Sequence, residues 1–328
     1  MDGVILLADK NSPSWDFAEK IQRYIKEKKE VEVPLEEVSI KHFRNGEINM
    51  YVPENVREKD IYFIHDASKN PQEWVVQIIL IKDLLRRSSA KKISLVFPAR
   101  SYERQDFKDK PHVPISARAL ADIIERGAER LIAMDLHSSQ IQGFYTIPVD
   151  ALSSAPDVID YLIAKKKTDN LVIVAADVGA TKRARNFASK LEKKLTELHL
   201  ATEIPLAIVE KRRPEQGRAE SINLIGDVSG KDVFIYEDII DSGGTLISAA
   251  ELLKKSGANS LTCYGTHAFF TENADIKLSK VYDSVMISNT IPYSPKEESK
   301  VEIVDVSGTF AEAIYRAQKG LSISKLFE

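Results

Sequence analysis

The sequence has only one cysteine, Cys263, among its 328 residues. A single thiol cannot build an intramolecular disulfide framework or a cysteine-rich zinc site, which suits a reducing compartment. Long apolar runs are also missing. No stretch approaches the roughly 20 residues that a membrane-spanning helix needs, and the apolar run near the N-terminus, about five residues long, has an Asp on each side. We therefore expect a cytoplasmic protein with no membrane partner.

An excess of charge of one sign is absent as well. The chain carries 46 Lys and Arg against 49 Asp and Glu, a formal net charge of -3. Such a balance gives no global positive field to hold a nucleic-acid backbone, so nucleic acid is not expected as a partner. Any phosphate binding must be local.

With 43% hydrophobic residues and no low-complexity tract, the chain is long enough to bury two cores of ordinary domain size.

Short apolar runs rich in β-branched residues alternate with longer segments of helical periodicity. Strands are expected at Gly3–Ala8, Asp60–His65, Lys92–Phe97, Arg130–Asp135, Leu171–Ala175, Ile204–Glu210, Asp232–Tyr236, Ser260–Gly265 and Lys300–Val306, and helices at Pro13–Lys28, Pro71–Arg87, Pro114–Arg126, Thr181–Leu198, Thr245–Ser256 and Thr309–Lys319. This alternation predicts an α/β protein with two similar, doubly wound and mostly parallel sheets. We expect domains at 1–150 and 151–328, with the last ~20 residues a candidate to pack back on the N-terminal domain.

The most informative stretch runs from Val233 to Thr245. It is a hydrophobic strand that ends in Glu237 and Asp238, followed by a glycine-rich turn that opens a helix. Backbone N–H groups of such a turn form an anion cradle, and the glycines permit a phosphate to approach closely. The paired acids suit a vicinal diol or a Mg²⁺ ion. The plain alternative is an acidic strand end followed by an ordinary helix cap.

The Val233–Thr245 string resembles the phosphoribosyl diphosphate loop that phosphoribosyltransferases share with the pyrophosphokinases that make their substrate. Further stretches are similar to the ribose-phosphate pyrophosphokinase family in particular, over essentially the full length and in the same order. These stretches are His42–Glu47, Phe97–Asp106, Pro114–Ala117, Met134–Phe144, Asp177–Gly179, Lys211–Arg213 and Ser322–Phe327. The resemblance implies that both domains are of the phosphoribosyltransferase-like type.

The family pattern also implies roles for individual residues. The ATP site would comprise Phe43, Asn45, Glu47, Arg104, Gln105, Asp106 and His137. The pyrophosphate loop would be Asp177, Val178, Gly179 and Ala180, and ribose 5-phosphate would be held by Glu237, Asp238, Asp241, Ser242, Gly243, Gly244 and Thr245. Lys211 and Arg213 would be catalytic, on a loop that closes over the transferring group, and His137 with Asp177 would bind Mg²⁺. Glu237 stands where the family usually has an Asp.

For some of these residues a structural role is the alternative. A lone histidine at a strand end is usually hydrogen-bonded and half-buried, Phe43 can be a core residue, and the basic run at Lys211 can be a solvated face. Imidazole is also an unusual ligand for Mg²⁺, which prefers oxygen.

The activity implied by the resemblance is transfer of the β,γ-pyrophosphoryl group of Mg-ATP to the 1-hydroxyl of ribose 5-phosphate, with a homodimer as the smallest expected assembly. Two alternatives stay open. A phosphoribosyltransferase would share the Glu237–Thr245 stretch but would not need Arg104, Gln105 or His137. A non-catalytic regulatory relative would be expected to lose part of the catalytic set, whereas this chain keeps it.

Overall fold

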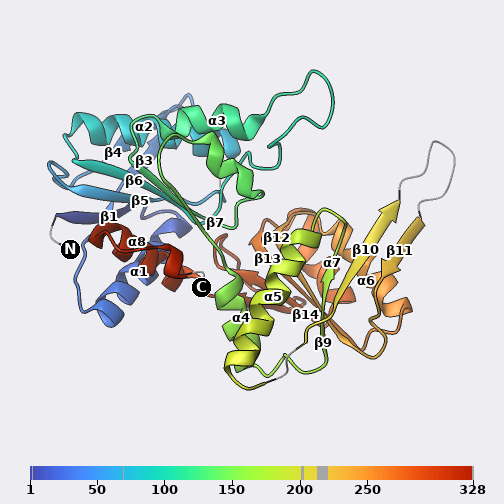
Figure 1. Ribbon diagram of the computed structural model, residues 1–328. Coiled ribbons are helices and arrows are strands. Elements are labelled where there is room, and N and C mark those ends of the chain that lie inside the picture. The colour runs from blue at the N-terminus through green and yellow to red at the C-terminus, as the bar shows by residue number, and fades with distance from the viewer. Residues whose placement is uncertain (2, 69, 201–202, 213–220, 327–328) are drawn as a thin grey trace. The chain divides into compact units, whose positions relative to one another are not determined.

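The computed structural model describes residues 1, 3–68, 70–200, 203–212 and 221–326. The chain divides into two compact units, each built on its own sheet (Figure 1). The first unit comprises Met1–Ser153, Thr290–Pro292 and Val306–Glu328, and the second comprises Ser154–Asn289 and Tyr293–Asp305. Both sheets are covered by helices, as the alternation of elements in the sequence predicts.

The first unit contains a six-stranded sheet in the order β2-β1-β5-β6-β7-β8. All of its neighbouring strands are parallel. The strands are β1 (Val4–Ala8), β2 (Leu35–Glu37), β5 (Asp60–Ile64), β6 (Lys92–Phe97), β7 (Arg130–Met134) and β8 (Val149–Leu152), and the helices are α1 (Pro13–Lys29), α2 (Pro71–Arg87), α3 (Ser116–Glu125) and α8 (Ser307–Lys319). Strands β3 (Ser39–His42) and β4 (Ile48–Tyr51) form a separate antiparallel hairpin.

One face of this sheet is covered by the first and last long helices of the chain. Helices α1 and α8 lie side by side, blue and red in Figure 1, and the rings of Phe17 and Phe310 meet edge to face with centroids 5.3 Å apart. An ion pair of 2.5 Å between Nζ of Lys29 and Oε2 of Glu312 also joins the two helices. The last helix therefore belongs to the first unit, because its apolar side completes that unit's core.

The second unit contains a seven-stranded sheet in the order β11-β10-β9-β12-β13-β14-β15. Its strands are β9 (Leu171–Ala175), β10 (Leu206–Arg212), β11 (Ser221–Ile225), β12 (Asp232–Ile240), β13 (Ser260–Ala268), β14 (Ser284–Ser288) and β15 (Val301–Val304), and its helices are α4 (Ala155–Ala164), α5 (Thr181–Glu197), α6 (Gly244–Lys255) and α7 (Ala274–Val281). The β10–β11 pair is antiparallel and the other pairs are parallel.

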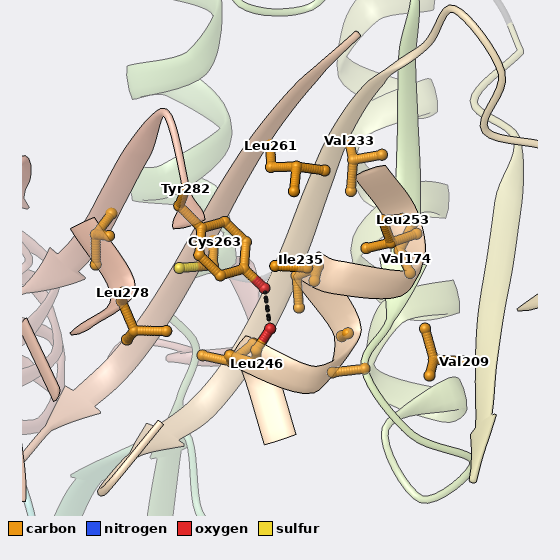
Figure 2. Packing of buried hydrophobic residues seen from close by; sticks show 14 of the residues in the cluster. Val174, Val209, Val233, Ile235, Leu246, Leu253, Leu261, Cys263, Leu278 and Tyr282 are labelled. Atoms are coloured by element: carbon orange, nitrogen blue, oxygen red, sulfur yellow. Dashed lines mark hydrogen bonds between the residues drawn. The ribbon is translucent and has the colours of Figure 1, made fainter. Parts of the chain in front are cut away.

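Alternate residues of β12 enter two different cores in this unit. Val233 and Ile235 pack with residues of α6 and with Leu278 of α7, whereas Phe234 and Tyr236 pack with residues of α4 and α5. This two-residue period is what a strand covered on both faces requires. In the first of these cores, shown in Figure 2, the hydroxyl of Tyr282 donates a hydrogen bond of 2.7 Å to the backbone oxygen of Leu246.

Gly265 of β13 lies against the side chain of Ile240, the last residue of β12. A Cβ atom at position 265 would overlap Cγ1 of Ile240 and lie 2.5 Å from its Cδ1. Ile240 is 1% exposed, so its side chain has little room to move away. Extra atoms in a close-packed core are destabilising because they force side chains off their preferred rotamers.

We therefore expect Gly265→Ala to lower the free energy of unfolding by about 1–3 kcal/mol, measured by urea denaturation. Gly143→Ala is the control, because a Cβ there meets no other atom within 4 Å. Equal stability of the two variants would show that β12 and β13 are not packed as described.

Candidate functional site

Most of the predicted site residues that lie in the second unit follow two neighbouring parallel strands. Strands β9 and β12 pair directly, with Leu171 opposite Asp232 and Val174 opposite Ile235. Strand β10 lies on the other side of β9, so the order of strands reverses between β9 and β12. In open α/β sheets, ligands bind beyond the carboxyl ends of the strands at such a reversal. The loops after β9 and β12 open at this place.

The loop after β12 forms a tight turn into helix α6. Gly243 has a φ of 76°, in the left-handed region, and a Cβ there would lie 3.3 Å from the side chain of Leu278. Both facts favour glycine at this position. Oδ1 of Asp241 accepts a hydrogen bond of 2.7 Å from the hydroxyl of Thr271, while Ser242, Gly244 and Thr245 are exposed. The N–H groups of the first turn of α6, which have no acceptor within the helix, therefore open toward solvent and are suited to an anion.

The loop after β9 has a similar form. Oδ1 of Asp177 accepts a hydrogen bond of 2.8 Å from the backbone N–H of Ala180, immediately before α5 begins. Asp177, Val178 and Gly179 are all exposed, and Val178 is 59% exposed. An exposed helix N-terminus that follows a short turn is a second position suited to an anion.

Arg183, in the first turn of α5, joins the two acids near the end of β12. Its Nη1 atom lies 2.5 Å from Oε2 of Glu237, and its Nη2 atom lies 3.1 Å from Oδ1 of Asp238. The side chains of Glu237 and Asp238 are 13% and 7% exposed. Arg183 was not predicted from the sequence, where its position shortly after the Asp177–Gly179 turn was the available signal.

The acids of this region act on one another. Burial raises the pKa of Glu237 to about 7 from an ordinary 4.5; Arg183 lowers it, and the charges of Asp238 and Asp177 raise it again. The turn after β9 and the end of β12 thus bring three carboxyl groups into one electrostatic environment. A bound group that donates hydrogen bonds or carries positive charge would be stabilised here.

In the first unit, predicted site residues follow the neighbouring parallel strands β6 and β7. Arg104 is exposed in the loop after β6, whereas Gln105 and Asp106 are half-buried. Oε1 of Gln105 accepts a hydrogen bond of 2.5 Å from the hydroxyl of Ser116, at the start of α3. His137 follows β7 and is half-buried, and its backbone N–H donates to Oε2 of Glu103 at 3.3 Å. The structure therefore brings the Arg104–Asp106 segment and His137 into one loop cluster.

Phe43, Asn45 and Glu47 lie elsewhere in this unit, in the turn of the β3–β4 hairpin. The turn is held by a hydrogen bond of 2.8 Å from the N–H of Phe43 to the backbone oxygen of Glu47 and one of 3.2 Å from the N–H of Glu47 to Oδ1 of Asn45. Phe43 is 55% exposed, so it is not a core residue. An exposed aromatic ring on a hairpin turn is available to a ligand or to another chain.

The two predicted catalytic cations fall at the edge of the described structure. Lys211 belongs to β10, where it pairs with Ile222 of β11. Its side chain and the whole of Arg213 lie outside the described residues. Their role stays a prediction from the sequence.

The acidic side chains of the second unit fit a magnesium ion that arrives bound to phosphates. Among the residues described here, no group of three or more His, Cys, Asp and Glu side chains is arranged to hold a metal ion. Mg²⁺ needs no such cage, since it usually keeps several waters and binds through one or two carboxylates together with substrate phosphates. The exposed carboxylate of Asp177 suits such a partial site.

In the described part of the chain, no helix is long and apolar enough to cross a membrane.

Comparisons with known proteins show which family the chain resembles. Residues 6–127 match the family described as the N-terminal domain of ribose phosphate pyrophosphokinase, and residues 196–328 match the phosphoribosyl synthetase-associated domain. The ribose-phosphate pyrophosphokinase of Wolinella succinogenes is 38% identical over 95% of this chain and 96% of its own length. That of Aquifex aeolicus is 36% identical over 100% of both chains.

A solved structure is similar over nearly the whole length as well. The phosphoribosylpyrophosphate synthetase from Mycobacterium smegmatis superposes with a TM-score of 0.85 at 28% identity, covering 97% of this chain and 100% of its own.

The raised pKa of Glu237 predicts a pH dependence of stability. The folded chain holds the proton of the Glu237 carboxyl more tightly than the unfolded chain does. Protonation of Glu237 therefore adds to the free energy of unfolding below pH 4.5, and this stabilisation is lost as the pH rises through about 7. Glu237→Gln should remove this pH-dependent loss of stability, which is on the order of 3 kcal/mol. The measurement is the free energy of unfolding from urea denaturation at several pH values between 4.5 and about 7, without magnesium. The exposed Glu297→Gln is the control and should retain it.

Arg183→Met tests the same carboxyl group, that of Glu237, by raising its pKa further. Removing the cation that lowers the pKa of Glu237 should extend the loss of stability above pH 7. Unchanged profiles for both Glu237→Gln and Arg183→Met would contradict the burial of this acid pair.

Proposed function

The chain belongs to the ribose-phosphate pyrophosphokinase family, and from this premise we propose how its residues divide the work of the reaction. The enzyme transfers the β,γ-pyrophosphoryl group of ATP to the 1-hydroxyl of ribose 5-phosphate, which yields 5-phosphoribosyl 1-diphosphate and AMP. Its two sheets are of the phosphoribosyltransferase-like type.

In the proposal, the second unit binds the sugar phosphate. The 5-phosphate lies at Asp241, Ser242, Gly243, Gly244 and Thr245, at the N-terminus of α6, and Glu237 and Asp238 accept hydrogen bonds from the ribose hydroxyls. The diphosphate group lies at Asp177, Val178, Gly179 and Ala180, before α5. The observation that carries this assignment is that two helix N-termini and an acid pair converge where the strand order reverses.

In the first unit, the loops after β6 and β7 bind the nucleotide. Arg104 offers a planar, permanently charged donor group, and Gln105 is held beside it by the start of α3, with Asp106 next in the chain. Phe43, Asn45 and Glu47 complete the nucleotide pocket of a neighbouring subunit. The exposure of Phe43 supports that role, which makes a homodimer the smallest active assembly.

Mg²⁺ is the proposed cofactor, with His137 and Asp177 as the residues that would hold it. When bound, the ion neutralises charge on the phosphate oxygens and orients them. The protein supplies the other contributions. In phosphoryl-type transfer the reacting groups must be held in line and the developing charge must be stabilised, and little covalent chemistry is asked of the side chains.

The 1-hydroxyl oxygen of ribose 5-phosphate attacks the β-phosphorus of ATP, a new P–O bond forms there, and the bond to the oxygen of the AMP phosphate breaks. The proton of the hydroxyl leaves to solvent. Lys211 and Arg213 are proposed to stabilise the negative charge that builds on the phosphate oxygens of the transferring group. A phosphoribosyltransferase would instead consume the sugar diphosphate together with a nucleobase, and a regulatory relative would turn over neither substrate.

Incubation with ribose 5-phosphate and Mg-ATP, with no nucleobase present, tests the proposal. We expect equal amounts of AMP and phosphoribosyl diphosphate, identified by phosphorus NMR. Phosphoribosyl diphosphate consumption only in the presence of a nucleobase would indicate a transferase, and the absence of both reactions would indicate a regulatory relative.

Lys211→Ala and Arg213→Ala should each lower kcat by about 10²–10³-fold with little change in the KM for ribose 5-phosphate, because these cations act mainly in the transition state. Lys255→Ala, an exposed cation at the end of α6, is the control and should leave both constants unchanged. A matching loss of ground-state binding in either catalytic variant would contradict the role.

A further inference from the structure

An arginine and a glutamate are buried beneath the proposed nucleotide loop of the first unit. Arg100 is 8% exposed and Glu103 is 5% exposed, and Nη1 of Arg100 lies 3.0 Å from Oε1 of Glu103. Charged side chains are almost never this buried unless they are paired. Both lie in the segment that leads from β6 to Arg104 and Gln105.

The pair connects this segment to the loop after β7. Oε2 of Glu103 accepts the backbone N–H of His137 at 3.3 Å. On the other side, Nη2 of Arg100 contacts the hydroxyl of Tyr145, and the guanidinium lies over the tyrosine ring, 5.3 Å from its centroid. Tyr145 follows the short 3₁₀ helix Ser139–Phe144 and is 8% exposed. The two charges therefore touch both ends of the segment that carries His137.

The backbone of the two loops is in a costly conformation. Tyr102 has a φ of 66° and Asp135 has a φ of 38°, and neither is a glycine. Such left-handed residues persist only where the surroundings hold them, and they occur preferentially at functional sites. Tyr102 lies between Arg100 and Arg104 in the sequence, and Asp135 lies shortly before His137. The buried pair is placed where it can hold both of these turns.

A buried ion pair is a poor device for stability alone. Desolvation of the two charges offsets most of their attraction, and replacing such a pair with apolar residues is often neutral for stability, whereas removing one partner is strongly destabilising. What the pair offers is a fixed geometry. Glu103 can meet Arg100 and the N–H of His137 together in only a narrow range of loop positions.

We propose that Arg100 and Glu103 are positioning residues for the nucleotide: together with Tyr145 they hold the loop that carries Arg104 and Gln105 in register with the loop that carries His137. This inference rests on the proposed function, in which these loops bind ATP. Neither residue is assigned contact with the substrate. Their effect is to keep the groups that bind the triphosphate at a fixed spacing.

The test compares Arg100→Met with the double variant Arg100→Met/Glu103→Leu. The single variant leaves a buried carboxylate without its cation, so we expect a lower Tm and at least a tenfold rise in the KM and Kd for Mg-ATP. The double variant removes both charges and should regain most of the Tm, because no unpaired charge remains. It should nevertheless keep the tenfold weakening for Mg-ATP, with the KM for ribose 5-phosphate within twofold of the unaltered chain.

Tyr145→Phe keeps the test decisive if Arg100→Met fails to fold. It removes only the hydroxyl that contacts Arg100, and we expect a threefold or greater rise in the Kd for Mg-ATP. Arg118→Met, which breaks the exposed pair with Asp122 on α3, is the matched control and should change neither binding constant.

Recovery of the Mg-ATP constants together with the Tm in the double variant would show that the pair is only structural and would overturn the inference. An equal rise in the constants for both substrates would overturn it too, as general damage to the fold. Calorimetric binding of Mg-ATP needs no turnover. An unaltered chain that forms no product therefore counts against the proposed function, whereas unchanged nucleotide binding in the variants counts against this inference alone.

Discussion

Parallel pairing is the constraint on which the candidate site depends. Because β9 and β12 run in the same direction, the chain leaves both strands at one edge of the sheet, and the reversal of strand order there allows the two following helices to diverge to opposite faces. The cores confirm the divergence, since α5 packs with Phe234 and Tyr236 and α6 packs with Val233 and Ile235. The helix N-termini that open beside the reversal are a consequence of the fold, and in our proposal the side chains around them select phosphates and sugar hydroxyls.

Each unit uses a partly or fully buried arginine to join two segments near the carboxyl ends of neighbouring strands. Arg183 connects the start of α5 with the acids of β12, and Arg100 with Glu103 connects the loop after β6 with the loop after β7. Hydrogen bonds between strands end where the strands end, so they cannot fix the loops beyond. A planar guanidinium with several fixed donors is well suited to span such a gap.

Sequence patterns predicted most of the central strands. The expected strands at Lys92–Phe97 and Leu171–Ala175 match β6 and β9 to the residue, because a central parallel strand is a continuous apolar run. The edge strand β2, with two glutamates among its residues, was missed because it has no continuous apolar run. Strand β14 was missed because its apolar run, although buried, is only three residues long. The glycine pattern of Asp241–Thr245 is local, so the turn that opens α6 could be predicted from the sequence. The residues that Arg100 and Arg183 contact are determined by tertiary packing, so the periodicity of the sequence does not predict them.

The place of α8 has a consequence for how the chain is made. Phe310, Ala313 and Ile314 complete the core that α1 and the first sheet begin, so that core lacks one wall until α8 has left the ribosome. The second unit is enclosed within the first in sequence and has all of its strands by Val304. Domains generally fold as units during synthesis, so the unit that begins second is the one that can finish first. Until the last helix docks, the apolar side of α1 stays accessible to chaperones.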